Sequence, residues 1–203
     1  MLDRRLFLGA AVLGAMSLGR APRGMARAEA FTAAQLNEFG PEARMIGKRV
    51  GLWDVTETAW DGPDAAPVTT TGLVAERRML GALLQEIIRP ATDTAHALVA
   101  RTDLLTYDRL TAQWQYVSFD ARGPDGLMLA ASDNRGDGVS IAFSFQPFAS
   151  PGPGPIVTGQ LLRLRQVITV RGADRDVKQQ YFTPADGTGR EWLGHQYDYR
   201  RRV

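Results

Sequence analysis

Apolar and polar residues alternate along most of this 203-residue chain, which is the pattern of β-strands with one buried face. The clearest run is 139–145. Its apolar face is formed by Val139, Ile141, Phe143 and Phe145, and small or hydroxyl side chains take the other face. A second run is Leu162–Val170, in which Arg163 and Arg165 face away from the apolar side. Both runs predict strands with one face toward a core.

Turn-forming clusters separate about nine or ten such runs, a spacing typical of hairpins. The clusters lie at 61–64, 123–126, 134–138, 171–174 and 186–189. No helical pattern lies between the runs, so the crossover helices that a parallel sheet requires are not expected. The sequence therefore predicts an all-β, antiparallel meander. Periodicity alone fits either a sandwich or a closed barrel.

Two segments depart from the strand pattern. Phe31–Lys48 is predicted to be helical, with a capping box at its start and a second short turn that Pro41 can open. The stretch Pro147–Pro155 is rich in Pro and Gly, and we predict a long loop without strand or helix there. The loop is expected to be a solvated connection, with a flap over a barrel mouth as the alternative.

The first 30 residues are predicted to be a removable export signal. Arg4–Arg5 precedes an apolar run, Leu6–Gly19, which is shorter than the roughly 20 residues that a membrane-spanning helix needs. Ala26–Ala30 then offers two small-x-small cleavage frames. The alternative is an uncleaved N-terminal anchor.

This N-terminal segment resembles a twin-arginine translocation signal, with Asp3 where that motif usually has Ser or Thr. Its five arginines, one aspartate and one glutamate carry +3, so the whole-chain charge of +2 becomes −1 for residues 31–203. That balance lacks the basic excess expected of a nucleic-acid-binding protein. We expect residues 31–203 to form one domain that is periplasmic or secreted, with no stable membrane span after cleavage.

Cysteine and histidine counts narrow the chemistry. The chain has no cysteine, which excludes disulfides, thiolate metal sites, a Cys nucleophile and c-type haem attachment. A multi-histidine metal site would need both His96 and His195 to meet with carboxylates between them, and we expect no metal. No Gly-x-Ser-x-Gly elbow of a serine hydrolase is present.

Three segments resemble the bacterial domain-of-unknown-function family 1579, whose members are lipocalin-like barrels. They are Gly47–Val55, with the Gly-x-Trp opening; Met79–Glu86; and Leu105–Gly123. Two positions depart from the family pattern: Gly81-Ala82 replaces its usual Gly-Gly, and Phe119 replaces a common Trp. The resemblance implies an antiparallel, calycin-type barrel of about 8–10 strands and implies no reaction, because the family is uncharacterised.

A barrel of that size encloses packed side chains or one small ligand. We predict five residues to line it as ligand-binding positions: Phe119, Phe143, Gln166, His195 and Tyr197. Gln166 interrupts an apolar strand face, where its amide needs protein partners, buried water or a ligand. His195 shares a face with Tyr197 and could be structural, bind a haem iron, or act as an acid or base. His96 is expected at the surface or a strand edge.

Trp53 and several charged residues are expected to have structural roles. Trp53 is expected to pack beneath an arginine of 200–202, as a first-strand Trp often does in lipocalin-like barrels. Glu76–Arg78, Arg163 and Arg165 are expected on the solvated exterior.

We hypothesise an exported protein that holds a small, mainly apolar ligand in a barrel lumen. A barrel enzyme of isomerase or hydratase type that uses His195 is the first alternative, and a ligandless interaction module is the second. The sequence identifies no cofactor.

Overall fold

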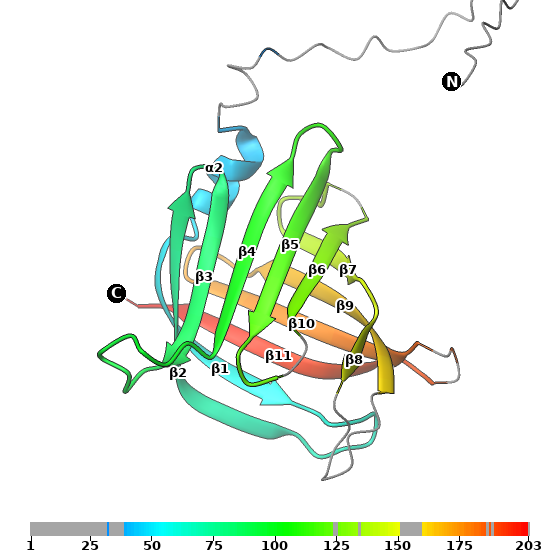
Figure 1. Cartoon of the computed structure of the whole chain (residues 1–203). Coiled ribbons are helices and arrows are strands. Elements are labelled where there is room, and N and C mark those ends of the chain that lie inside the picture. The colour runs from blue at the N-terminus through cyan, green and yellow to red at the C-terminus, as the bar shows by residue number, and fades with distance from the viewer. Residues whose placement is uncertain are drawn as a thin grey trace, which may run out of the picture.

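The computed structural model describes residues 32, 39–123, 126–133, 135–150, 160–185, 187 and 189–202, which form a β-barrel with a short helix over one end (Figure 1). The helix is α2 (Pro41–Gly47). The strands are β1 (Gly51–Ala59), β2 (Val68–Leu80), β3 (Leu83–Pro90), β4 (Arg101–Asp108), β5 (Gln113–Asp120), β6 (Leu127–Ser132), β7 (Ser140–Phe145), β8 (Phe148–Ser150), β9 (Gln160–Val170), β10 (Arg175–Pro184) and β11 (Trp192–Arg201).

The sheet closes on itself. Neighbouring strands run antiparallel in the order β10-β11-β1-β2-β3-β4-β5-β6-β7-β9, and β10 also pairs with β9 from Asp176↔Val170 to Pro184↔Leu162. That last ladder joins the two ends of the order and excludes a two-layered sandwich. The predicted antiparallel barrel of about 8–10 strands with a short N-terminal helical segment is confirmed, since ten strands form the wall.

The helix α2 crosses one end of the barrel. Pro41 occupies its first turn, where the missing N–H costs nothing. Ala43 and Ile46 are buried, and the helix contacts β3 and β4. This part of the predicted helical segment is confirmed, whereas its first part, residues 33–38, lies outside the described residues. None of the described helices is long and apolar enough to cross a membrane.

Two predicted boundaries were wrong. Phe148–Ser150, predicted as loop, forms β8 and pairs with the start of β9. This ladder is short, because only three residues can pair with the free edge of the longer strand β9 before the next proline ends the strand. Val139 was placed on the buried face of its strand, but it precedes β7 and is 54% exposed. Residues 151–159 lie outside the described residues.

Inside the barrel, two apolar clusters flank a band of polar side chains. The first cluster lies mainly on β3, β4, β5, β7 and β9 and includes Trp114, Tyr116 and Phe143. The second lies on β1, β2, β3 and β11 and includes Trp53 and Tyr199. The polar band between them is where the interior departs from an ordinary hydrophobic core.

Candidate functional site

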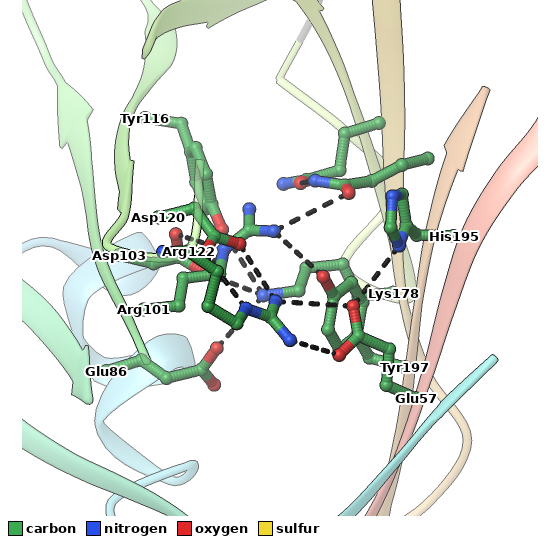
Figure 2. A network of polar contacts seen from close by, with 12 residues as sticks. Glu57, Glu86, Arg101, Asp103, Tyr116, Asp120, Arg122, Lys178, His195 and Tyr197 are labelled. Carbon is green, nitrogen blue, oxygen red and sulfur yellow. Dashed lines mark hydrogen bonds and ion pairs between the residues drawn. The ribbon is translucent and has the colours of Figure 1, made fainter. Parts of the chain in front are cut away.

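A set of eight ionised side chains, four cations and four anions, is buried in the barrel interior. They are Arg49, Arg77, Arg101, Lys178, Glu57, Glu86, Asp103 and Asp176. Most project from strands on opposite walls, because the same alternation that turns apolar residues inward also turns these positions inward (Figure 2). Buried ions are tolerated only when they are paired and hydrogen-bonded.

Lys178 lies at the centre of this network. Its Nζ donates to Asp103 Oδ2 at 2.6 Å and to Glu86 Oε1 at 3.0 Å, and it lies 3.5 Å from the Tyr116 hydroxyl (Figure 2). Tyr199 also donates to Glu86 Oε1, at 2.9 Å. Lys178 on β10 therefore links the walls formed by β3, β4 and β5 across the barrel.

Two arginines share the carboxylate of Asp176. Arg49 donates to it through Nε at 3.1 Å and Nη2 at 2.6 Å, and Arg77 donates through Nη1 at 2.6 Å. Arg77 also donates from Nε to Glu86 Oε2 at 2.6 Å. Since Arg49 lies two residues after the end of α2, its bidentate contact fixes the end of the helix to the β10 wall.

Three guanidinium groups surround the Trp53 ring. The Cζ atoms of Arg49, Arg77 and Arg201 lie 4.6, 4.7 and 4.4 Å from the ring centroid. The predicted stacking of Trp53 with an arginine of the last strand is confirmed through Arg201. The ring also donates from Nε1 to the Arg49 carbonyl at 3.0 Å, so Trp53 is held by contacts over its ring and at its edge.

The network determines the ionisation of its members. Burial alone would raise the pKa of Asp103, but the charges of Arg101 and Lys178 outweigh it and hold that pKa below its ordinary value. Burial opposes ionisation of Glu86 in the same way, and Lys178 and Arg77 lower its pKa. Burial raises the pKa of Tyr197, so its hydroxyl stays protonated. The interior thus combines fixed carboxylates with neutral hydroxyls.

A cavity of about 70 Å³ lies between α2 and this network. Its apolar wall consists of Met45, Ile46, Leu84, Leu105, Ile141, Ile168 and Val170. Its polar floor consists of Arg49, Arg77, Glu86, Asp103, Asp176 and Lys178 with Tyr116 and Tyr199. Met45 and Ile46 belong to α2, so the helix forms the roof.

The opposite end of the barrel carries a second polar cluster. Arg122 follows β5 and donates to Glu57 Oε2 on β1 at 2.6 Å and to Asp120 Oδ2 at 2.8 Å (Figure 2). His195 Nδ1 lies 3.2 Å from Glu57 Oε1, and the ring stacks on Tyr197. Burial would raise the pKa of Glu57, but its bonds to His195 and Arg122 lower it below the ordinary value. Arg122 therefore joins two distant strands across this end.

Four of the five predicted lining residues lie at the barrel interior, and one does not. Phe143, Gln166 and Tyr197 are almost fully buried, and His195 is at the rim with a side chain 33% exposed. Phe119 was placed inward incorrectly: it is 42% exposed on the outer face, because it is one residue out of phase with the inward-facing Ser118. None of the five lines the cavity under α2, and their role in ligand binding stays a prediction.

Only one of the two polar atoms of the Gln166 amide has a hydrogen-bond partner among the described residues. Its Oε1 accepts from Gln180 Nε2 at 2.8 Å, while its Nε2 has no hydrogen-bond partner among the described residues. Turning the Gln180 amide over would let its oxygen accept from Arg101 Nη2 at 3.0 Å and would require Gln166 to turn as well. In either arrangement one polar atom of the Gln166 amide has no hydrogen-bond partner among the described residues. The sequence left protein partners, buried water and a ligand open for this amide, and Gln180 supplies one protein partner.

Sequence reasoning missed the charged interior. Arg77 was assigned to the solvated exterior together with its neighbours, yet it is buried and pairs with Glu86 and Asp176. A signal was present: Arg101 and Asp103 have the same strand phase as the buried Leu105. His96 is exposed as predicted, with a side chain 57% accessible. Among the described residues no three His, Asp or Glu side chains converge as a metal site would require.

Comparisons with known proteins support the fold and leave the activity open. No protein-family model matches the sequence, and no curated protein matches it. Among solved structures, the chain is similar to the crystal structure of Rv2717c from M. tuberculosis, with a TM-score of 0.50 and 13% sequence identity over 82% of this chain and 100% of that chain. At that identity the likeness concerns the fold alone, which is a lipocalin-like barrel.

Proposed function

We propose that the protein binds a small, mainly apolar molecule in the cavity beneath α2. The observation that supports this proposal is the division of the cavity surface into an apolar wall and a hydrogen-bonding floor. Leu105, Ile141 and Ile168 offer dispersion contacts to an apolar body. The hydroxyl oxygens of Tyr116 and Tyr199 can accept a hydrogen bond from one end of it. Such a combination is typical of ligand sites.

The cavity volume limits the ligand. A water-sized group occupies about 10–15 Å³ by the same measure, so the cavity accepts about five non-hydrogen atoms without rearrangement. A longer molecule fits only if Met45 and Ile46 move aside and let its chain extend past α2. We therefore infer either a compact ligand or a longer one whose polar end is held inside.

The charge balance of the floor indicates a neutral polar group. Each of Arg49, Arg77 and Lys178 already donates to at least one of Glu86, Asp103 and Asp176. A charged ligand would add one uncompensated ion to this buried set, which is strongly unfavourable. A hydroxyl or amide group adds none, so short alcohols and amides are the expected ligand class.

Thermal-shift and calorimetric titrations with matched probes test the proposal. Butan-1-ol and butyramide are expected to stabilise the protein, whereas butyrate and butylammonium are not. Leu105→Trp should abolish the effect by filling the cavity, and Leu104→Trp, on the outward face of the same strand, should leave it intact. Native mass spectrometry of freshly purified protein adds a direct search for a bound organic mass. Equal responses of the two variants would contradict the proposal and favour a ligandless interaction module.

A barrel enzyme is a second candidate, supported by the pairing of His195 with Glu57. A carboxylate on Nδ1 orients an imidazole and leaves Nε2 to exchange a proton. Hydration of an α,β-unsaturated carbonyl compound, followed by NMR, would test this chemistry. Activity that survives His195→Gln would exclude it.

We also propose that the protein is exported by the twin-arginine route, on the basis of the N-terminal sequence. Replacing Arg4 and Arg5 with lysine should retain the protein in the cytoplasmic fraction. Unchanged fractionation would contradict this route.

A further inference from the structure

We propose that the ligand of the cavity beneath α2 has a straight alkyl chain that passes Met45 and lies in a groove on the outer side of that residue. This inference rests on the proposed function, and it narrows the ligand class to neutral straight-chain alcohols and amides of about eight to ten carbons. Met45 is then the residue that decides whether a molecule longer than the cavity can bind.

A groove of about 160 Å³ lies between α2 and residues 135–138, which belong to the connection between β6 and β7. In Figure 1 the helix and this connection lie at the same end of the barrel. Most of the groove surface comes from residues without a charged side chain, namely Pro41, Met45, Trp114, Gly136 and Gly138. We call this space the α2 groove. Its surface suits an alkyl chain, which needs dispersion contacts and no hydrogen bonds.

Met45 separates the α2 groove from the cavity. Its side chain lines both spaces, and it is partly buried against the apolar cluster that includes Trp114. The two spaces also adjoin beside Gly136, which lines the groove: a Cβ added there would lie 3.4 Å from Cγ1 of Ile141, which lines the cavity. One layer of side chains therefore divides them. Because a methionine side chain is unbranched and flexible, it can turn aside without a shift of the backbone.

The walls of the α2 groove are fixed by polar contacts that do not involve Met45. Arg135 donates from Nη2 to Glu42 Oε1, which joins the β6–β7 connection to the first turn of α2. Trp114 Nε1 donates to the Arg135 carbonyl at 2.8 Å, which holds the same connection against β5. The one ion pair at the groove edge is thus already balanced, so the groove calls for an uncharged chain.

The volumes of the two spaces set the length of the ligand. The cavity accepts about five non-hydrogen atoms, and by the same measure the α2 groove accepts about ten more. A four-carbon alcohol therefore ends inside the cavity. A chain of about eight to ten carbons places its hydroxyl group at Tyr116 and Tyr199 and its far half along Trp114. The passage is only as wide as the Met45 side chain, which favours a straight chain over a ring.

Isothermal titration calorimetry of the purified full chain with butan-1-ol, hexan-1-ol and octan-1-ol tests the inference. Each methylene that leaves water tightens binding about threefold to fourfold. Moving Met45 offsets part of this gain, so octan-1-ol should bind at least about tenfold more tightly than butan-1-ol. Met45→Trp fills the passage and should make the two dissociation constants equal. Arg44→Trp is the matched control, because Arg44 is exposed on the same helix; it should leave their ratio unchanged.

Met45→Ala is a second variant that keeps the test decisive if Met45→Trp does not fold. It removes the side chain that must move, so the preference for octan-1-ol should rise at least about threefold. Equal binding of octan-1-ol and butan-1-ol by the parent would overturn the inference and leave the proposed function standing, provided that Leu105→Trp abolishes butan-1-ol binding. A preference for octan-1-ol that is the same in the parent and both Met45 variants would also overturn the inference, because the chain then lies elsewhere. If the parent binds no alcohol, the proposed function fails as well.

Discussion

Replacing Lys178 with methionine tests whether the interior ion network holds the barrel walls together. Lys178 is 2% exposed and donates to carboxylates on β3 and β4. Methionine keeps most of the side-chain volume and removes the charge, which leaves Glu86 and Asp103 facing each other with one cation fewer. Lys48, the other lysine of the chain, is exposed, so Lys48→Met is the matched control.

The expected loss can be bounded from the contacts. Breaking a buried ion pair from one side typically costs about 3–5 kcal/mol. The lower end applies here, because Asp103 keeps its bond from Arg101 at 2.9 Å and Glu86 keeps its bond from Arg77 at 2.6 Å. We therefore expect a loss of about 3 kcal/mol in the free energy of unfolding near neutral pH. Adding Asp103→Asn should recover part of it, since the removed cation then leaves one carboxylate fewer unpaired.

Urea denaturation followed by tryptophan fluorescence measures the loss, because Trp53 and Trp114 are buried. With a slope of about 2 kcal/mol/M, the midpoint should fall by about 1.5 M. The pKa values of Glu86 and Asp103 are lowered in the folded state, so their stabilisation is complete above the ordinary values of 4.5 and 3.8 and is lost as the pH falls below them. The difference between parent and Lys178→Met should therefore shrink below about pH 4. A loss under 1 kcal/mol, or one that is the same at pH 3 and pH 7, would refute the argument.

Three further changes probe other parts of the barrel. Gly194→Ala should lower the free energy of unfolding by at least about 1–3 kcal/mol, because an added Cβ would collide with the Phe182 ring. Gly62→Ala is the control: its added Cβ meets nothing within 4 Å, so it should be near neutral in the same urea titration. Trp53→Phe should lower the free energy of unfolding, measured by thermal unfolding, by about 1–3 kcal/mol. It removes the Nε1 bond to the Arg49 carbonyl and weakens three cation–π contacts. A loss below about 0.5 kcal/mol would mean that the positions of the arginines do not depend on the Trp53 ring. Arg122→Gln should accelerate hydrogen exchange at the ends of β1 and β5, because it removes the ion pair between Arg122 and Glu57. Unchanged exchange would show that this contact does not hold the end closed.

The strands that form the wall of the barrel could be predicted from the sequence, but the ion network inside the barrel could not. Alternation fixes which residues turn inward, so Phe143, Gln166 and Tyr197 were placed correctly from period alone. The same alternation was not applied to charged positions such as Arg77, because a charged residue is ordinarily exposed. Whether an inward Arg is tolerated depends on its partners on other strands. Glu86 lies opposite Arg77 on the neighbouring strand β3, nine residues away, whereas Asp176 is 99 residues away on β10. The hairpin pattern contains the first partner, and no local pattern contains the second.

The two ends of the barrel are closed in different ways, and this difference locates the binding site. At one end Arg122 bridges Glu57 and Asp120, so opening that end separates ion pairs. At the other end Met45 and Ile46 of α2 form an apolar roof over the cavity, and the helix is held beyond its end by Arg49. The ion network fills the space between the ends, so a molecule that reaches the cavity must pass α2. A variant that loosens α2, such as Arg49→Met, should therefore speed association and dissociation of a bound alcohol, while Arg122→Gln should change neither rate.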